Sequence, residues 1–214
     1  MRVHLFTRRV IGRALSAIAA TAVAFAVLGS SALAAPPVVR DHTASSGGAA
    51  SNTVCVGTLC TTTSLFAIVD NPDGPAQACL DISSYDKTEM GFVPLGYETG
   101  CSLFASSSFS IDTKDLTTAS LAPTAILVQA FTCNSTGCTP AGTRTALVSA
   151  TYTGVGGLAT FRSNSKSTFG GCSMYFVGKG SSREATATLT IDSRSLDALG
   201  SLFTSTQKIK VLCH

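Results

Sequence analysis

Apolar and polar side chains alternate along two runs near the middle of the chain, residues 125–132 and 144–153. In the second run Ala146, Val148 and Tyr152 occupy even-numbered positions, and threonine, leucine and serine occupy the odd-numbered positions between them. This two-residue period is typical of a β-strand with two different faces. Between the runs, Cys133 and Cys138 bracket the turn-forming residues Asn, Ser and Gly. The pattern therefore predicts a β-hairpin closed by a disulfide.

Similar short runs, separated by turn signals, occupy most of the remaining chain. The strand candidates are residues 62–69, 76–82, 92–97, 101–105, 108–111, 158–162, 172–177, 182–191 and 207–213. In the last of these, Lys208 and Lys210 alternate with Ile209 and Val211, which is typical of an edge strand. Residues 195–203 are the one candidate for a short helix. So many short strands predict an all-β fold, and we expect a mostly antiparallel, disulfide-bonded β-sandwich.

Cysteine usage indicates four disulfides. The chain has eight cysteines, an even number that is typical of an exported disulfide-bonded protein. No Cys-x-x-Cys pair occurs, so we expect no metal site in their place. The cysteines are Cys55, Cys60, Cys79, Cys101, Cys133, Cys138, Cys172 and Cys213.

Weak internal sequence similarity indicates two related halves, about 54–124 and 125–214. Gly-Cys-Ser at 100–102 returns at 171–173, and Ile-Asp-Thr-Lys at 111–114 returns as Ile-Asp-Ser-Arg at 191–194. Each half also begins with a Cys-x4-Cys loop, so a duplicated unit and chance similarity in a Ser/Thr-rich chain both remain open. If the halves are related, the simplest of the 105 pairings keeps each bridge within its half. Those pairs are Cys55–Cys60, Cys79–Cys101, Cys133–Cys138 and Cys172–Cys213.

The first 34 residues are typical of a signal peptide. Four arginines precede an Ala-rich apolar stretch, and small residues end at Ala34, where we expect cleavage. Residues 7–13 resemble a twin-arginine export signal but depart from it at Gly12, so we favour the general secretory route in a bacterium. Residues 35–53 have almost no apolar bulk and are expected to form a flexible tail before the β domain, residues 54–214. The apolar stretch is too short for a membrane span, and we expect no transmembrane segment in the mature chain.

Removal of the leader changes the charge balance. The full chain carries 15 Lys and Arg against 12 Asp and Glu, but four of the arginines lie in the leader. The mature net charge is therefore −1, and its cations are scattered along the sequence. On this basis we expect no nucleic-acid partner.

Residues suited to catalysis are few. The mature histidines are His42 and the terminal His214, so a triad hydrolase lacks a well-supported base. Asp81, Asp86 and Glu89 are candidates for a carboxylate pair, but we favour a solvated loop, because acids on a surface are ordinary. Residues 70–74 contain oxygen ligands but lack the spacing of a calcium loop and fit a turn instead. We expect no catalytic residue, metal or cofactor.

The sequence thus predicts a secreted, non-catalytic binding or structural module of the cell exterior. Its expected partner is a cell-envelope component, a glycan or an extracellular protein. The first alternative is a protease inhibitor that presents the loop between Cys133 and Cys138, since a preformed loop binds with little ordering cost. The second is a secreted hydrolase that uses a carboxylate pair in the segment from Asp81 to Glu89.

Overall fold

Residues 38–70, 74, 76–88 and 91–213 are described by a computed structural model, and they belong to one unit, Pro36–His214. The predicted leader, its cleavage site, Glu89 and His214 lie outside these residues. No α-helix occurs in the described part, and no helix there is long and apolar enough to cross a membrane. The elements are β1 (Val38–Val56), β2 (Leu59–Asp70), β3 (Ala76–Thr88), β4 (Gly91–Phe104), the 3-10 turn η1 (Ser106–Ser108), β5 (Phe109–Ile111), β6 (Thr118–Asn134), β7 (Gly137–Phe169), β8 (Cys172–Ile191) and β9 (Arg194–Cys213).

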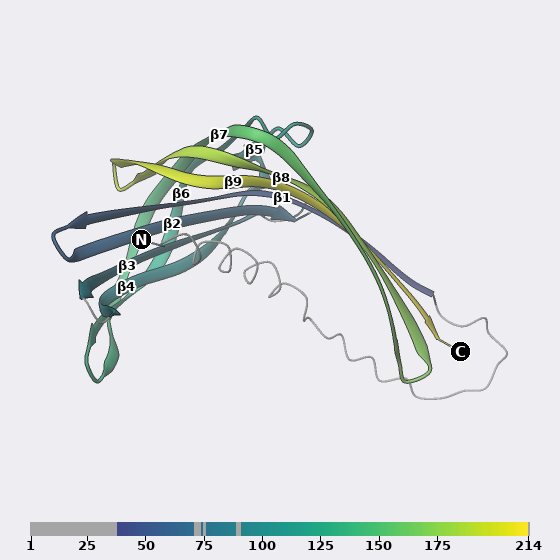
Figure 1. Cartoon of the computed structure of the whole chain (residues 1–214), viewed down its shortest axis with the longest axis horizontal. Coiled ribbons are helices and arrows are strands. Elements are labelled where there is room, and N and C mark those ends of the chain that lie inside the picture. The colour runs from purple at the N-terminus through teal and green to yellow at the C-terminus, as the bar shows by residue number, and fades with distance from the viewer. Residues whose placement is uncertain (1–37, 71–73, 75, 89–90, 214) are drawn as a thin grey trace, which may run out of the picture. The chain divides into compact units, whose positions relative to one another are not determined.

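All nine strands form a single antiparallel sheet in the order β4-β3-β2-β1-β9-β8-β7-β6-β5. A further pairing of β4 with β6 joins the two sides, so eight strands run in a closed ring (Figure 1). The prediction of an all-β, antiparallel, disulfide-bonded fold is confirmed. The sandwich is not, because the sheet closes on itself and needs no second sheet to bury its apolar face.

The closed part of the sheet holds the core. Side chains alternate across a strand, so every second residue points inward, as Ala146, Val148 and Tyr152 do in β7. Closure requires β4 and β6 to approach closely. A side chain at Gly100 in β4 would collide with the carbonyl oxygen of Leu127 in β6, so only glycine permits this approach. The largest fully buried side chains are Leu65, Leu80, Leu116, Ile126, Leu189, Leu202, Val128 and Val148.

The expected flexible tail is wrong for the residues that the structure describes. Residues 38–53 belong to β1, which pairs with β2 on one side and β9 on the other. Their small side chains match large neighbours: a Cβ on Gly48 would lie 3.2 Å from both Tyr152 and Leu202. The composition of residues 38–53 suggested disorder because they have few large apolar side chains. In the fold, neighbouring strands supply the large apolar side chains, and the small residues of β1 leave space for them.

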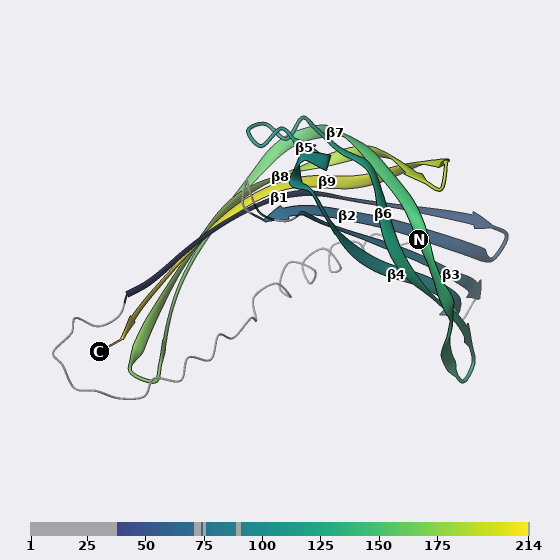
Figure 2. The same ribbon diagram turned by 180° about the vertical axis from the view of Figure 1, so that it is seen from behind.

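Four strands of the same sheet continue beyond the closed ring, and we call this four-stranded part the extension (Figures 1 and 2). It consists of residues 38–44 of β1, 159–169 of β7, 172–182 of β8 and 203–213 of β9. Two expectations are wrong here. Residues 207–213 do not form an edge strand, because β9 lies between β1 and β8. Residues 195–203 are not helical, because pairing with β8 and β1 extends β9 through them.

The four disulfides are those expected if each half is bridged internally. They join Cys55–Cys60, Cys79–Cys101, Cys133–Cys138 and Cys172–Cys213, and no described cysteine is free. Each bridge links residues directly opposite one another on adjacent antiparallel strands. The predicted hairpin at Cys133–Cys138 is thus confirmed, while the duplication stays a prediction.

Candidate binding face

The extension gathers five of the cations that are scattered along the sequence on one of its two faces. Directly opposite residues of an antiparallel pair point to the same side of the sheet. Arg162 lies opposite Lys179, and the neighbouring rows place Lys166 opposite Tyr175 and Tyr175 opposite Lys210. Val177 lies opposite Lys208 and so belongs to the same side. The basic face is therefore defined by Arg162, Lys166, Lys179, Lys208 and Lys210.

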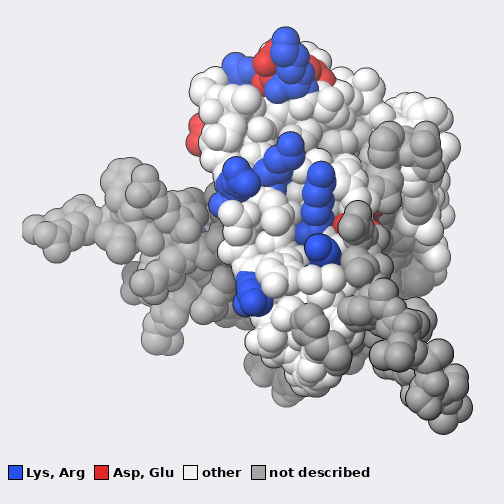
Figure 3. Space-filling view, turned by 90° about the vertical axis from the view of Figure 1, so that its right-hand side faces the viewer, with Lys and Arg blue, Asp and Glu red and all other residues white. Residues whose placement is uncertain are grey.

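All five cations of the basic face are exposed, and none forms an ion pair with another residue of the described ranges. Figure 3, which looks at the side where the extension lies, shows Lys and Arg side chains gathered with little acidic surface among them. Asp41 is the only acid in the extension, and its partner Ile209 places it on the opposite face. Cations that are scattered along the sequence thus lie together in the fold. The absence of a nucleic-acid partner stays a prediction.

One aromatic ring lies within the basic face. The ammonium nitrogen of Lys166 lies 5.2 Å from the centroid of the Tyr175 ring, within the range of a cation–π contact. Lys210 flanks the same tyrosine from β9. The ring thus gives the face an apolar contact between two cations.

The opposite face of the extension carries phenylalanine rings among serine and glycine residues. The ring of Phe161 covers Gly180 and that of Phe176 lies near Gly178, where a larger side chain would clash. Phe169 at the tip is 91% exposed. The extension therefore presents two chemically different surfaces, a basic one with five cations and an opposite one whose charged side chain is Asp41.

Of the three candidate carboxylates, Asp81 and Asp86 are not brought together, and Glu89 lies outside the described residues. Asp81 and Asp86 lie in β3 at positions of opposite parity, so their side chains leave opposite faces of the sheet. Asp81 accepts a hydrogen bond from the hydroxyl of Thr99, an ordinary cross-strand contact. Two carboxyls on opposite faces cannot flank one scissile bond, so Asp81 and Asp86 do not supply such a pair together, and the hydrolase alternative stays a prediction.

The other predicted sites are dispersed. His42 is exposed in β1, and residues 71–73 of the candidate calcium turn lie outside the described ranges. Among the described residues no group of three or more His, Cys, Asp or Glu could hold a metal ion. In the loop between Cys133 and Cys138, Asn134 accepts hydrogen bonds from the backbone N–H and the hydroxyl of Thr136, at 2.9 and 2.6 Å. Those bonds make a tight turn at the tip of the predicted inhibitor loop.

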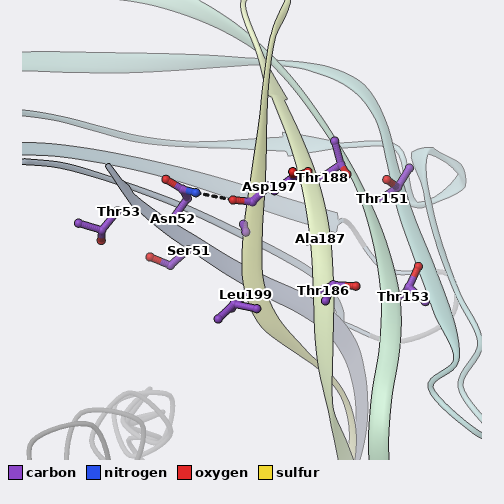
Figure 4. Close-up of a pocket in the computed structure, with 11 residues that line it drawn as sticks. Ser51, Asn52, Thr53, Thr151, Thr153, Thr186, Ala187, Thr188, Asp197 and Leu199 are labelled. Atoms are coloured by element: carbon purple, nitrogen blue, oxygen red, sulfur yellow. Dashed lines mark hydrogen bonds between the residues drawn. The ribbon is translucent and has the colours of Figure 1, made fainter. Parts of the chain in front are cut away.

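A shallow hollow of about 550 Å³ lies on the outer face of the closed ring (Figure 4). Register places Thr151 opposite Thr188, and Thr153 opposite Thr186, so their hydroxyls form a regular array. Asn52 donates a hydrogen bond to the backbone oxygen of Asp197 at its side. The hollow offers hydroxyls and one carboxylate, without the base and oriented partner that nucleophilic catalysis needs.

Two aspartates in turns, Asp112 and Asp192, have lowered pKa values because their carboxylates accept hydrogen bonds. The carboxylate of Asp112 accepts bonds from the hydroxyl of Thr117 and from three backbone N–H groups, which lowers its pKa to about 2. Asp192 accepts a bond from the backbone N–H of Leu147 at 2.9 Å and one from Arg144, so its pKa is lowered too. The same guanidinium binds Glu98 at 2.6 Å, and its own pKa is raised mainly by that bond. The bonds of Asp112 and Asp192 hold turns, the Arg144–Glu98 ion pair joins β7 to β4, and none of these residues lines the hollow.

No protein-family model, no curated protein and no solved structure matches this chain. The functional assignment therefore depends on the geometry alone. In the described part, the basic face brings five cations together on one side of the sheet without an ion pair to any of them.

Proposed function

We propose that the protein works outside the cytoplasm as a non-catalytic binding module that holds an anionic partner on its basic face. The observation that carries this proposal is the placement of five unpaired cations on one side of the extension. A cluster of one sign attracts an oppositely charged ligand and accelerates its association. Four disulfides and the leader pattern support an oxidising location such as the cell exterior.

Rigidity supports a binding role for this surface. Three of the cations lie on β8 and β9, which are paired on both sides through the extension, and the Cys172–Cys213 bridge joins these strands at its end. A preformed array of charges loses little conformational freedom on binding. Anionic components of the cell envelope and acidic extracellular proteins both fit this surface.

Polyphosphate is a suitable probe, because it is a polyanion without a peptide backbone. The oxidised protein is titrated with polyphosphate at low and at physiological ionic strength. We expect binding that weakens as salt is added, because exposed charges are screened over about 8 to 10 Å. Replacement of Lys179, Lys208 and Lys210 by Gln should weaken binding about tenfold or more.

The matched control replaces three cations that lie away from the extension, Lys87, Lys114 and Arg194, by Gln. This variant has the same change in net charge and should bind polyphosphate almost as the parent does. Equal losses in the two triple variants would show that net charge, and not the basic face, holds the ligand. No binding to the parent would refute the proposed function.

A further inference from the structure

The β7 strand is an open edge of the extension. Its residues 159–169 pair with β8 on one side, whereas β6 pairs with β7 only as far as Thr153. No described strand lies on the other side, and every residue from 159 to 169 is exposed. Such an edge presents a row of unpaired backbone groups that can accept another strand.

The register shows which backbone groups face outward. Phe169 and Cys172 flank a two-residue turn, so they form a hydrogen-bonded pair. Hydrogen-bonded and non-hydrogen-bonded pairs alternate along an antiparallel ladder. The N–H and C=O groups directed to the open edge therefore belong to every second residue, namely Thr160, Arg162, Asn164, Lys166 and Thr168.

These outward-facing residues are the ones whose side chains lie on the basic face. An added antiparallel strand would place its own hydrogen-bonded residues opposite Arg162, Asn164 and Lys166, on the same side of the sheet. Acidic side chains at alternate positions of that strand would then lie beside Arg162 and Lys166, with Lys179 one strand further in. Backbone pairing supplies affinity and the charges supply specificity.

We propose that the open edge of β7 takes up an extended peptide segment whose side chains are acidic at every second position. This inference rests on the proposed function and names the partner of the same face: an acidic protein strand. A second copy of this chain fits less well, because edge-to-edge pairing of two β7 strands brings four cations to one seam. Like charges that face each other across strands are destabilising.

The test uses an octapeptide of alternating Glu and Thr. In the proposed complex the N–H groups of the Glu residues bind β7 and those of the Thr residues point away. Backbone N-methylation at the Glu residues should therefore weaken binding about tenfold or more, since several hydrogen bonds are lost. N-methylation at the Thr residues, which keeps charge, composition and number of methyl groups, should leave binding nearly unchanged.

Amide hydrogen exchange provides a second readout on the oxidised protein. The amides of Arg162, Asn164 and Lys166 should become protected when the parent peptide binds, whereas those of Ser163 and Ser165 should already be protected by β8. Equal binding of both N-methylated peptides without this alternation would overturn strand addition. Polyphosphate binding, which involves no strand, would in that case still support the proposed function. The proposed function itself is refuted only if the protein does not bind polyphosphate.

Dimer formation is tested in the same samples by sedimentation. If the amides of Arg162, Asn164 and Lys166 are already protected without peptide and the protein sediments as a dimer, a second copy occupies the edge and the inference is wrong. A monomer that takes up the octapeptide supports it. The variant Arg162→Gln/Lys166→Gln should lose peptide affinity in that case, while Lys114→Gln/Arg194→Gln should keep it.

Discussion

Gly48 in β1 faces the ring of Tyr152 in β7 so closely that a Cβ atom would lie 3.2 Å from the ring carbon Cζ. Leu202 approaches the same point from β9, also at 3.2 Å. The interior of the closed ring is thus filled by large residues of β7 and β9, and β1 contributes the space they need. Burial raises the pKa of the Tyr152 hydroxyl.

Substitution of Gly48 should therefore destabilise the fold. Gly48→Val introduces two methyl groups against Tyr152 and Leu202, and overpacking of this kind costs about 1–3 kcal/mol in the free energy of unfolding. Ser51→Val, on the exposed outer side of the same strand, should change it by less than about 0.5 kcal/mol. Denaturant titration measures both. Equal and negligible effects would mean that residues 38–53 are a tail after all.

A disulfide that closes a long loop should stabilise the fold more than one that closes a short loop. The Cys172–Cys213 bridge closes a loop with a sequence separation of 41, whereas Cys133–Cys138 spans only 5. Chain entropy gives about 4 kcal/mol for the long loop and about 2 kcal/mol for the short one. Double replacement by serine at each bridge, followed by denaturant unfolding, should rank them in this order. A larger loss at Cys133–Cys138 would contradict the ranking.

The lowered pKa of Asp112 gives the fold an acid-sensitive contact. Its folded pKa of about 2 lies below the ordinary 3.8, so its contribution to stability is present above pH about 4 and is lost as the pH falls towards 2. The hydroxyl of Thr117 is the main cause, so Thr117→Val should move the pKa back towards 3.8. Carbon-13 NMR titration of the carboxyl group measures the shift.

Thr113→Val is the control for that experiment, because Thr113 lies in the same loop and is exposed. It should leave the pKa of Asp112 near 2. If Thr117→Val also leaves it there, the backbone N–H groups alone hold the carboxylate in its charged form.

Export should remove the leader at one position. We expect the mature chain to begin at Ala35, because the small residues that a signal peptidase recognises end at Ala34. Mass spectrometry of the N-terminal peptide from the exported protein tests this. A protein that retains Arg8 and Arg9 in the exported fraction would show that the segment is not cleaved.

Much of the fold was accessible from the pattern of residues. The alternation of Ala146, Val148 and Tyr152 predicted a strand with two different faces, because period two is a local property of extended backbone, and these three residues prove to be the buried ones. The order of the cysteines suggested all four bridges. Strand lengths were underestimated: β7 runs from Gly137 to Phe169, through the glycines at 154, 156 and 157, which looked like a break.

The candidate site was far less accessible. Arg162 and Lys210 are distant in the sequence, and each looked like an isolated cation. They share a face only because β7 pairs with β8 and β8 with β9 in one particular register. A shift of that register by one residue would place them on opposite faces.

The sequence by itself determined the all-β class and the two-faced alternation of several strands, and it suggested a within-half disulfide scheme, since these depend on neighbours along the chain. Closure of the sheet, the incorporation of residues 38–53 as β1 and the assembly of the basic face were decided by the tertiary structure alone. They depend on which strands meet and in what register. Pairing between distant strands is set by packing of the whole core, which no local pattern contains.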